Sequence, residues 1–155
     1  MQALLTASLP LLKEELPLTK VSGRMNSEAM ISGPILHLEE PLSFWGGLDP
    51  ATGTITDIHH PQVGVSVTGK ILVMEHGRGS SSSSSVVLEL IRNKAGPVAI
   101  ILLEMDTHIV LGSIAAEELY GLLMPIIVVS RNILESLHTG AVSYTHLTLP
   151  TICSV

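Results

Sequence analysis

The sequence predicts one α/β domain, and two patterns along the chain carry this prediction. From residue 71 onward, short apolar runs alternate with segments of helical periodicity, and this alternation is typical of a parallel sheet. Before residue 71, short apolar runs are separated by glycine- and proline-containing turns, which favours antiparallel pairing. We therefore expect a layered β/β/α domain with an antiparallel, turn-rich first half and a parallel strand–helix second half.

The first half begins with a strand and continues as a hairpin-like unit. A Gly-Pro pair inside the first strand indicates a bend or bulge that keeps the strand near an edge, and the Asp-Pro-Ala-Thr-Gly sequence is a strong turn signal. The expected elements are a strand at Ala29–Leu38, a short apolar segment at Leu42–Trp45, a turn at Asp49–Gly53 and a strand at Thr54–Ile58, which His59-His60-Pro61 ends.

The second half contains three predicted strands, each followed by a helix. Buried strands are expected at Ile71–Met74, Val98–Leu103 and Pro125–Val129, and helices at Val86–Asn93, Ser113–Tyr120 and Asn132–His138. The helix boundaries follow from apolar side chains at helical spacing. Gly121 stands close to a C-cap position and Ser130 at an N-cap position.

The composition is that of a small domain with part of its surface covered. Of 155 residues, 46 % are hydrophobic and 14 % are charged, whereas soluble domains average about 25 % charged residues. The mean hydropathy is +0.48. A partner that covers part of the surface would explain the low charge, although buried strands account for much of the same signal.

Several classes of protein are disfavoured. The net charge is −6, aromatic residues make up 3 %, and no basic stripe is present, so no nucleic-acid partner is expected. The start of the chain lacks a basic region and contains Pro10, which does not fit a signal peptide. The apolar runs at Val98–Leu103 and Pro125–Val129 are too short to span a bilayer, so we expect no membrane partner and a cytoplasmic location. The lone Cys153 gives no disulfide framework.

The two ends of the chain differ from its middle. Residues 1–22 lack clear periodicity and are interpreted as an N-terminal extension. From Val142 to Thr151 the chain has no charged side chain and resembles a reading frame of a transposon-end adapter used in shotgun sequencing. We therefore interpret residues 142–155 as adapter read-through and 23–141 as the domain, truncated at its C-terminal end. The sheet edge near Val128 would then lack a partner strand. An ordinary strand at Thr145–Leu149 is the alternative.

The loop between the predicted strand at Ile71–Met74 and the following helix is the sharpest functional feature. It reads Gly77-Arg78-Gly79, followed by six serines from Ser80 to Ser85. Glycines let the backbone approach a ligand closely, and a helix N-terminus directs N–H groups and positive charge toward it. Arg78 adds a planar fork suited to carboxylate or phosphate. This pattern predicts an anion-binding site, with a flexible Gly/Ser linker as the alternative. It lacks the Gly-Lys-Ser/Thr ending of a P-loop.

Specific sequence motifs resemble the small subunit of aconitase X-type dehydratases. They are Pro41–Gly53 (PLSFWGGLDPATG), Asp57, His59-His60-Pro61, Gly64, Gly69-Lys70, His76–Ser82 (HGRGSSS) and Ala116–Gly121 (AEELYG). The similarity covers roughly residues 23–139 in the order and spacing of the family. It implies a swivelling β/β/α domain that closes on a larger, iron–sulfur-bearing subunit.

The resemblance also implies an activity. Members of the family are hydro-lyases that dehydrate small hydroxy acids: phosphomevalonate in isoprenoid biosynthesis in archaea, and cis-3-hydroxy-L-proline in hydroxyproline metabolism in bacteria. A serine after Gly-Arg-Gly is the family's proposed proton acceptor, which is Ser80 here. We expect Arg78, Gly79, Ser81, Ser82 and His76 to bind the substrate.

No metal ligand is assigned to this chain. An iron–sulfur cluster needs thiolates, so we expect the cluster on a large-subunit partner, in a heterodimer that is active only when both chains are present. One departure is that several bacterial relatives have a cysteine and a glycine within the stretch where this chain has Ser81 to Ser85, which leaves the choice of hydroxy acid open. The alternative function is a non-catalytic swivelling domain that binds an acidic ligand or a partner protein.

The remaining polar residues of these motifs are given structural roles. His59 and His60, which stand before Pro61, are interpreted mainly as capping a turn, with substrate contact as the alternative. Asp49 and Asp57 are expected to fix turns. Phe44 and Trp45 are expected in the core or at a subunit interface.

Overall fold

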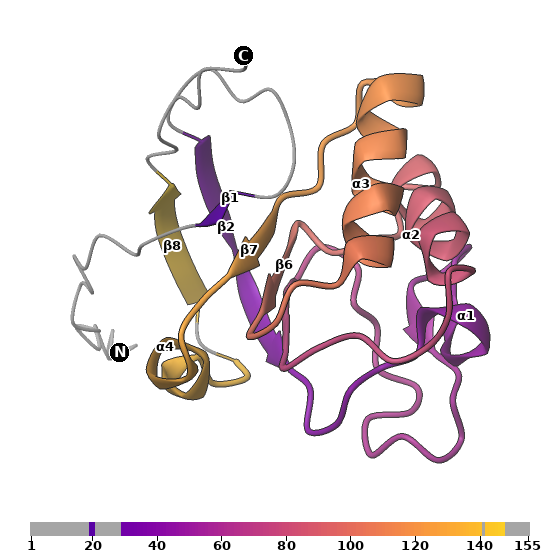
Figure 1. Ribbon diagram of the computed structural model, residues 1–155. Coiled ribbons are helices and arrows are strands. Elements are labelled where there is room, and N and C mark those ends of the chain that lie inside the picture. Colours follow the sequence, from indigo (N-terminus) through magenta and orange to yellow (C-terminus); the bar gives the residue numbers. More distant parts are fainter. Residues whose placement is uncertain (1–18, 21–28, 141, 148–155) are drawn as a thin grey trace, which may run out of the picture.

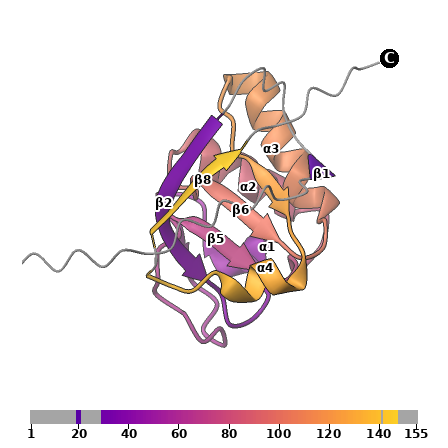
Figure 2. The same ribbon diagram turned by 90° about the vertical axis from the view of Figure 1, so that its left-hand side faces the viewer.

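The computed structural model describes residues 19–20, 29–140 and 142–147, with side-chain surroundings described for residues 31–140. Its main feature is a six-stranded sheet with the strand order β1-β7-β6-β5-β2-β8 (Figure 1, Figure 2). The strands are β1 (Thr19–Lys20), β2 (Ala29–His37), β5 (Ile71–Met74), β6 (Ala99–Leu102), β7 (Ile126–Val128) and β8 (Val142–Leu147).

The four inner strands of this sheet are parallel, and the two outer strands are antiparallel to their neighbours. A separate two-stranded antiparallel sheet contains β3 (Leu48–Asp49) and β4 (Thr54–Ile55). The predicted mixed α/β class, with a hairpin in the first half and parallel strands in the second, is confirmed. Strand β2 differs from the rest of the first half, because it pairs in parallel with β5.

The helices lie on both faces of the large sheet. They are α1 (Phe44–Gly47), α2 (Ser83–Arg92), α3 (Thr107–Tyr120) and α4 (Arg131–Ser136). Figure 1 shows α2 and α3 side by side on one face and α4 on the other. Strands β5, β6 and β7 follow one another in a single direction across the sheet. Right-handed crossovers between them therefore place α2 and α3 on the same face.

The parallel strands separate two apolar clusters. In β5, Leu72 and Met74 contribute to the cluster beneath α2 and α3, whereas Ile71 and Val73 contribute to the cluster beneath α4. All four side chains are buried, as expected for a strand inside a parallel sheet that is covered on both faces. Side-chain alternation along each strand thus builds the core and fixes which face each helix covers.

The predicted helices are present, but α2 and α3 begin three and six residues earlier than predicted. Helix α4 begins one residue earlier and ends at Ser136, before the predicted His138. Helix α2 begins at Ser83, inside the serine run, because the Ser84 and Ser85 hydroxyls donate to backbone carbonyls three residues earlier and so fit a helical turn. Helix α3 begins at Thr107, six residues before the predicted start. The Asp106 carboxylate accepts hydrogen bonds from two backbone amides there and forms an N-cap that the sequence analysis missed.

Strands also occupy the two segments at the ends. Thr19 and Lys20 pair with Val128 and Ile127, so the prediction of an unpaired sheet edge near Val128 is wrong: chain from the first 22 residues covers that edge. Strand β8 pairs with the first part of β2. Whether residues 142–155 are encoded by adapter sequence stays a prediction, and sequencing the gene past codon 141 from source DNA tests it.

Candidate functional site

The Gly-Arg-Gly-Ser sequence lies in the loop that joins β5 to α2, which we call the β5–α2 loop (residues 75–82). Strands β2, β5, β6 and β7 are parallel, so their carboxyl ends meet at one edge of the sheet, and the loop follows one of these ends. In open α/β sheets this edge is where ligands bind. The fold therefore places the predicted anion-binding loop at the expected edge.

Backbone contacts hold the middle of the loop against the segment that leads into α1. The Arg78 amide donates to the Leu42 carbonyl at 3.0 Å, and Ser43 and Arg78 form an isolated parallel bridge. Gly79 has a φ of 129°, and a Cβ atom there would lie 3.2 Å from the Ser43 hydroxyl oxygen and 3.3 Å from that of Ser83. The positive φ favours glycine at 79, and the two nearby hydroxyls leave little room for a Cβ atom.

The loop is also packed against the start of α3. A Cβ atom at Gly77 would collide with the Asp106 carboxylate and would lie 2.9 Å from Ile109 Cδ1. Because the Asp106 carboxylate caps α3, the path of the loop and the start of that helix depend on each other. These contacts argue against a flexible Gly/Ser linker.

The six serines divide into two groups. Ser83 is 4 % exposed, and the hydroxyls of Ser84 and Ser85 donate to the carbonyls of Ser81 and Ser82 at 2.7 Å and 2.8 Å. Ser80, Ser81 and Ser82 are exposed, and within residues 31–140 their hydroxyls make no hydrogen bond that would occupy them. The side chains free to meet a ligand are therefore those of the first three serines.

One arginine side chain and one helix N-terminus lie together at this point of the molecule. The Arg78 side chain is 60 % exposed, and one guanidinium nitrogen lies 3.4 Å from Asp57 Oδ2. Helix α2 directs its N-terminus toward the loop and carries no acidic residue in its first turn, so no side-chain carboxylate there offsets its dipole. The arrangement suits an anion held beside the exposed serines.

The histidines of the motifs have different surroundings. His76 is exposed, and its Nδ1 lies 2.9 Å from the Gly77 carbonyl oxygen, which keeps the ring beside the loop. His60 is 5 % exposed; its Nε2 lies 3.1 Å from the Glu40 carbonyl oxygen, and its Nδ1 accepts from the Gln62 amide. Both ring nitrogens of His60 are thus used inside the protein, which favours the structural role.

The two aspartates predicted to fix turns do so. Asp49 accepts hydrogen bonds from the Ala51 amide and the Thr52 hydroxyl, and these bonds lower the pKa of its carboxyl. Asp57 Oδ1 accepts from the His59 amide at 2.9 Å. The contact between Asp57 and Arg78 was missed, because 21 positions separate the two residues and no local pattern relates them. The position of Ser43 beside Gly79 was missed for the same reason.

The two aromatic residues of α1 face opposite environments. Phe44 is fully buried in the core, whereas Trp45 is 64 % exposed. Both residues were expected in the core or at a subunit interface. Phe44 is a core residue, and Trp45 is exposed and available for contact with another chain.

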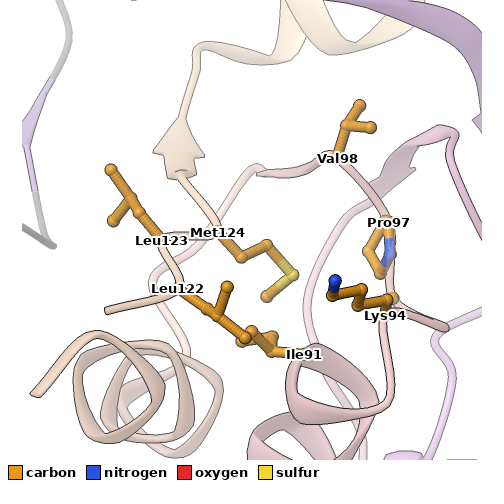
Figure 3. A pocket seen from close by; sticks show the side chains of 8 residues that line it. Ile91, Lys94, Pro97, Val98, Leu122, Leu123 and Met124 are labelled. Atoms are coloured by element: carbon orange, nitrogen blue, oxygen red, sulfur yellow. The ribbon is translucent and has the colours of Figure 1, made fainter. Parts of the chain in front are cut away.

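A shallow pocket of about 300 Å³ lies at the opposite edge of the sheet. It is lined by Ile91 of α2 and by residues that precede β6 and β7, among them Val98 and Met124, with the Lys94 side chain beside them (Figure 3). Because Val98 and Met124 stand before the amino ends of their strands, the pocket is separated from the β5–α2 loop by the length of the strands. It is not part of the candidate site.

The described part of the chain contains neither a cluster of metal-ligating side chains nor a membrane-spanning helix. Within it, no group of three or more histidine, cysteine or acidic side chains is placed to hold a metal ion. No helix among the described residues combines the length and the apolar character needed to cross a bilayer.

A sequence model described as the aconitase X swivel domain matches residues 20–148. The chain belongs to this family. The match includes the β5–α2 loop and the segment that anchors it, so the family assignment covers the whole candidate site.

Two aconitase X-type relatives illustrate how the domain occurs. The cis-3-hydroxy-L-proline dehydratase of Pseudomonas aeruginosa is 47 % identical over 95 residues, which are 61 % of this chain but 16 % of that protein. The phosphomevalonate dehydratase small subunit of Methanosarcina acetivorans is 42 % identical over 98 residues, which are 63 % of this chain and 68 % of that one. The chain thus spans a small part of the first relative and most of the second.

A solved structure shows the same fold. The crystal structure of Thermococcus kodakaraensis aconitase X in its holo-form superposes with a TM-score of 0.67 and 34 % sequence identity, over 81 % of this chain and 86 % of that one. The swivel-domain fold expected from the sequence motifs is therefore confirmed for this chain.

Proposed function

We propose that this chain is the small subunit of a two-subunit aconitase X-type hydro-lyase that dehydrates a small hydroxy acid of the phosphomevalonate or cis-3-hydroxy-L-proline type. The observation that carries the proposal is the β5–α2 loop. Three unengaged serine hydroxyls and an exposed arginine lie there together at the carboxyl edge of the sheet. Both substrate types carry an acid group that such a loop can bind.

Ser80 is the proposed proton acceptor. Dehydration breaks a C–H bond and the C–O bond on the neighbouring carbon; the C–H electron pair becomes the new C=C bond, and hydroxide leaves. A serine hydroxyl is a weak base unless its anionic form is stabilised. Arg78 and the N-terminus of α2 supply positive charge beside Ser80, which is the setting that a serine base requires.

The neighbouring residues are proposed to bind the substrate. Arg78 pairs with the acid group of the substrate, and Gly79 lets the backbone approach it. Ser81, Ser82 and His76 are exposed around the same loop and can donate hydrogen bonds to its oxygens. Among the described residues, the hydroxyls of Ser81 and Ser82 make no hydrogen bond, and the Nδ1 of His76 is engaged with the Gly77 carbonyl, which leaves its Nε2 for a ligand.

The residues of this chain do not fit an iron–sulfur cluster. Such clusters are held by thiolates, and the one cysteine of the sequence, Cys153, lies outside the described residues. We propose that the large subunit holds the iron–sulfur cluster of the enzyme. The steps assigned to the residues of this chain do not involve the cluster. The cytoplasmic location inferred from the sequence stays a prediction.

The relatives support a partner chain. The domain matches 16 % of the cis-3-hydroxy-L-proline dehydratase and 68 % of the phosphomevalonate dehydratase small subunit. The same module therefore occurs both joined to a much longer remainder and as a chain of its own. We propose that a separate large subunit supplies that remainder here.

Exposed apolar side chains mark the surface that this partner covers. Trp45, Ile58 and Met105 are 64 %, 78 % and 52 % exposed. Each stands one or two positions from a residue that touches the β5–α2 loop: Trp45 follows Ser43, Ile58 follows Asp57, and Met105 precedes Asp106. We propose that these three residues belong to the surface around the loop, which has to face the active site of the complex.

The variant Ile58→Asp tests this surface. We expect it to weaken the affinity for the large subunit by about 10-fold or more, because it places an unpaired charge in a desolvated contact. The matched control is Leu119→Asp, whose side chain is 66 % exposed near the end of α3 that points away from α1 (Figure 1). Titration of labelled large subunit measures both affinities. Equal affinities for the two variants would contradict the proposed surface.

A further inference from the structure

The Asp57 carboxylate makes two contacts that serve different purposes. Its Oδ1 accepts a hydrogen bond from the His59 amide at 2.9 Å, which closes a local turn. Its Oδ2 lies 3.4 Å from a terminal nitrogen of the Arg78 guanidinium. The first contact is a common structural use of aspartate, whereas the second reaches another part of the fold.

The backbone around Asp57 is held firmly enough to fix the position of this carboxylate. The amides of Thr56 and Asp57 both donate to the Gly47 carbonyl, at 2.9 Å and 3.3 Å. The Asp57 side chain is 18 % exposed, so the carboxylate is partly buried beside Arg78. A carboxylate fixed in this way can hold a long, mobile cationic side chain in one orientation.

Arg78 is such a side chain. Its backbone is anchored through the Leu42 carbonyl, but its side chain is 60 % exposed, and Asp57 is its one ion-pair partner among the described residues. The long contact distance engages one nitrogen, which leaves the other guanidinium donors available to an anion. An exposed arginine without such a partner would lose more conformational entropy when it binds a ligand.

We infer that Asp57 is a positioning residue, which orients the Arg78 guanidinium toward the substrate's acid group. This inference rests on the proposed function, in which Arg78 binds that group. Asp57 itself does not touch the substrate. Its effect therefore passes through Arg78 and disappears when Arg78 is removed.

Asp57→Asn separates positioning from turn formation. Asparagine keeps the acceptor for the His59 amide but removes the negative charge that faces Arg78. In the two-subunit enzyme we expect KM to rise about 5-fold with kcat within about 2-fold, as for the loss of a partly exposed ion pair. The matched control is Asp49→Asn, which alters another turn-fixing aspartate of the same segment that has no cation partner among the described residues. Its KM is expected to stay at the wild-type value.

A double-mutant cycle decides the matter. Arg78→Ala alone is expected to raise KM by about 10-fold or more, as for loss of a charged hydrogen bond to substrate. Asp57→Asn in the Arg78→Ala background is expected to add nothing. A further 5-fold rise in the double variant, or a wild-type KM for Asp57→Asn alone, would overturn the positioning role while leaving the proposed function intact. A wild-type KM for Arg78→Ala would overturn both.

Discussion

Replacing Ser80 by alanine in the two-subunit enzyme is expected to lower kcat by about 10²–10⁴-fold, the usual cost of losing a general base. KM is expected to stay within about 3-fold, because proton transfer occurs on the way to the transition state and contributes little to the bound ground state. Ser80 is exposed, so the substitution removes a hydroxyl without disturbing the core. Steady-state assays of the purified complex measure both constants.

The other serines provide graded controls for this variant. The Ser84 hydroxyl is engaged with the Ser81 carbonyl and so is not available to accept the substrate's proton. Ser84→Ala is therefore expected to leave kcat within about 2-fold, the equivalent of about 0.5 kcal/mol or less. Ser81→Ala and Ser82→Ala are expected to have mild effects. If Ser80→Ala is active and either Ser81→Ala or Ser82→Ala is inactive, the proton acceptor is the serine whose replacement abolishes activity. If the alanine variants of Ser80, Ser81 and Ser82 are all active, the loop only binds an anion, which favours the alternative of a non-catalytic swivelling domain.

Replacing Gly112 by alanine is expected to destabilise the domain by about 1–3 kcal/mol, the cost of overpacking a well-filled contact. A Cβ atom at Gly112 would lie 2.6 Å from the Ser84 carbonyl oxygen and 2.7 Å from Val87 Cβ, so α2 and α3 could not keep their present separation. Helix propensity alone predicts the opposite sign, since alanine is favoured over glycine by about 1 kcal/mol inside a helix. Urea denaturation of the isolated chain measures the difference.

The neighbouring position gives a matched control for the packing argument. Leu111 lies on the same helix with a 56 % exposed side chain, so Leu111→Ala is expected to change stability by less than about 0.5 kcal/mol. An unchanged or raised stability of Gly112→Ala would show that the two helices are not in close contact. Because Ser84 belongs to the first turn of α2, such a result would also weaken the argument that packing fixes the β5–α2 loop.

The fold was predictable where local pattern determines structure. The buried runs at Ile71–Met74 and 98–103 have the length and composition of inner parallel strands, and both form them. The start of α3 was not predicted, because Gly112 interrupts the helical pattern and the Asp106 cap is a single side chain. The partner of the Val128 edge was missed because it is a two-residue strand far away in sequence, and no periodicity marks so short a segment.

The candidate site was predictable in part for a similar reason. Arg78, Gly79 and the serines are adjacent in sequence, so their chemistry could be recognised without a structure. The division of the serine run follows from hydrogen bonds of the first helical turn, which depend on where α2 begins. The contact of Asp57 with Arg78 depends on tertiary structure, and composition or spacing gives no signal for it.

The central claim, that this chain contributes the catalytic serine of a two-subunit dehydratase, is tested most directly by recombining it with its large subunit. Each purified chain and their mixture would be assayed with phosphomevalonate and with cis-3-hydroxy-L-proline. The account predicts that the mixture dehydrates one of the two, that neither chain alone does so, and that a mixture containing Ser80→Ala does not. Turnover by the large subunit alone, or a stable complex that dehydrates neither compound, would contradict it.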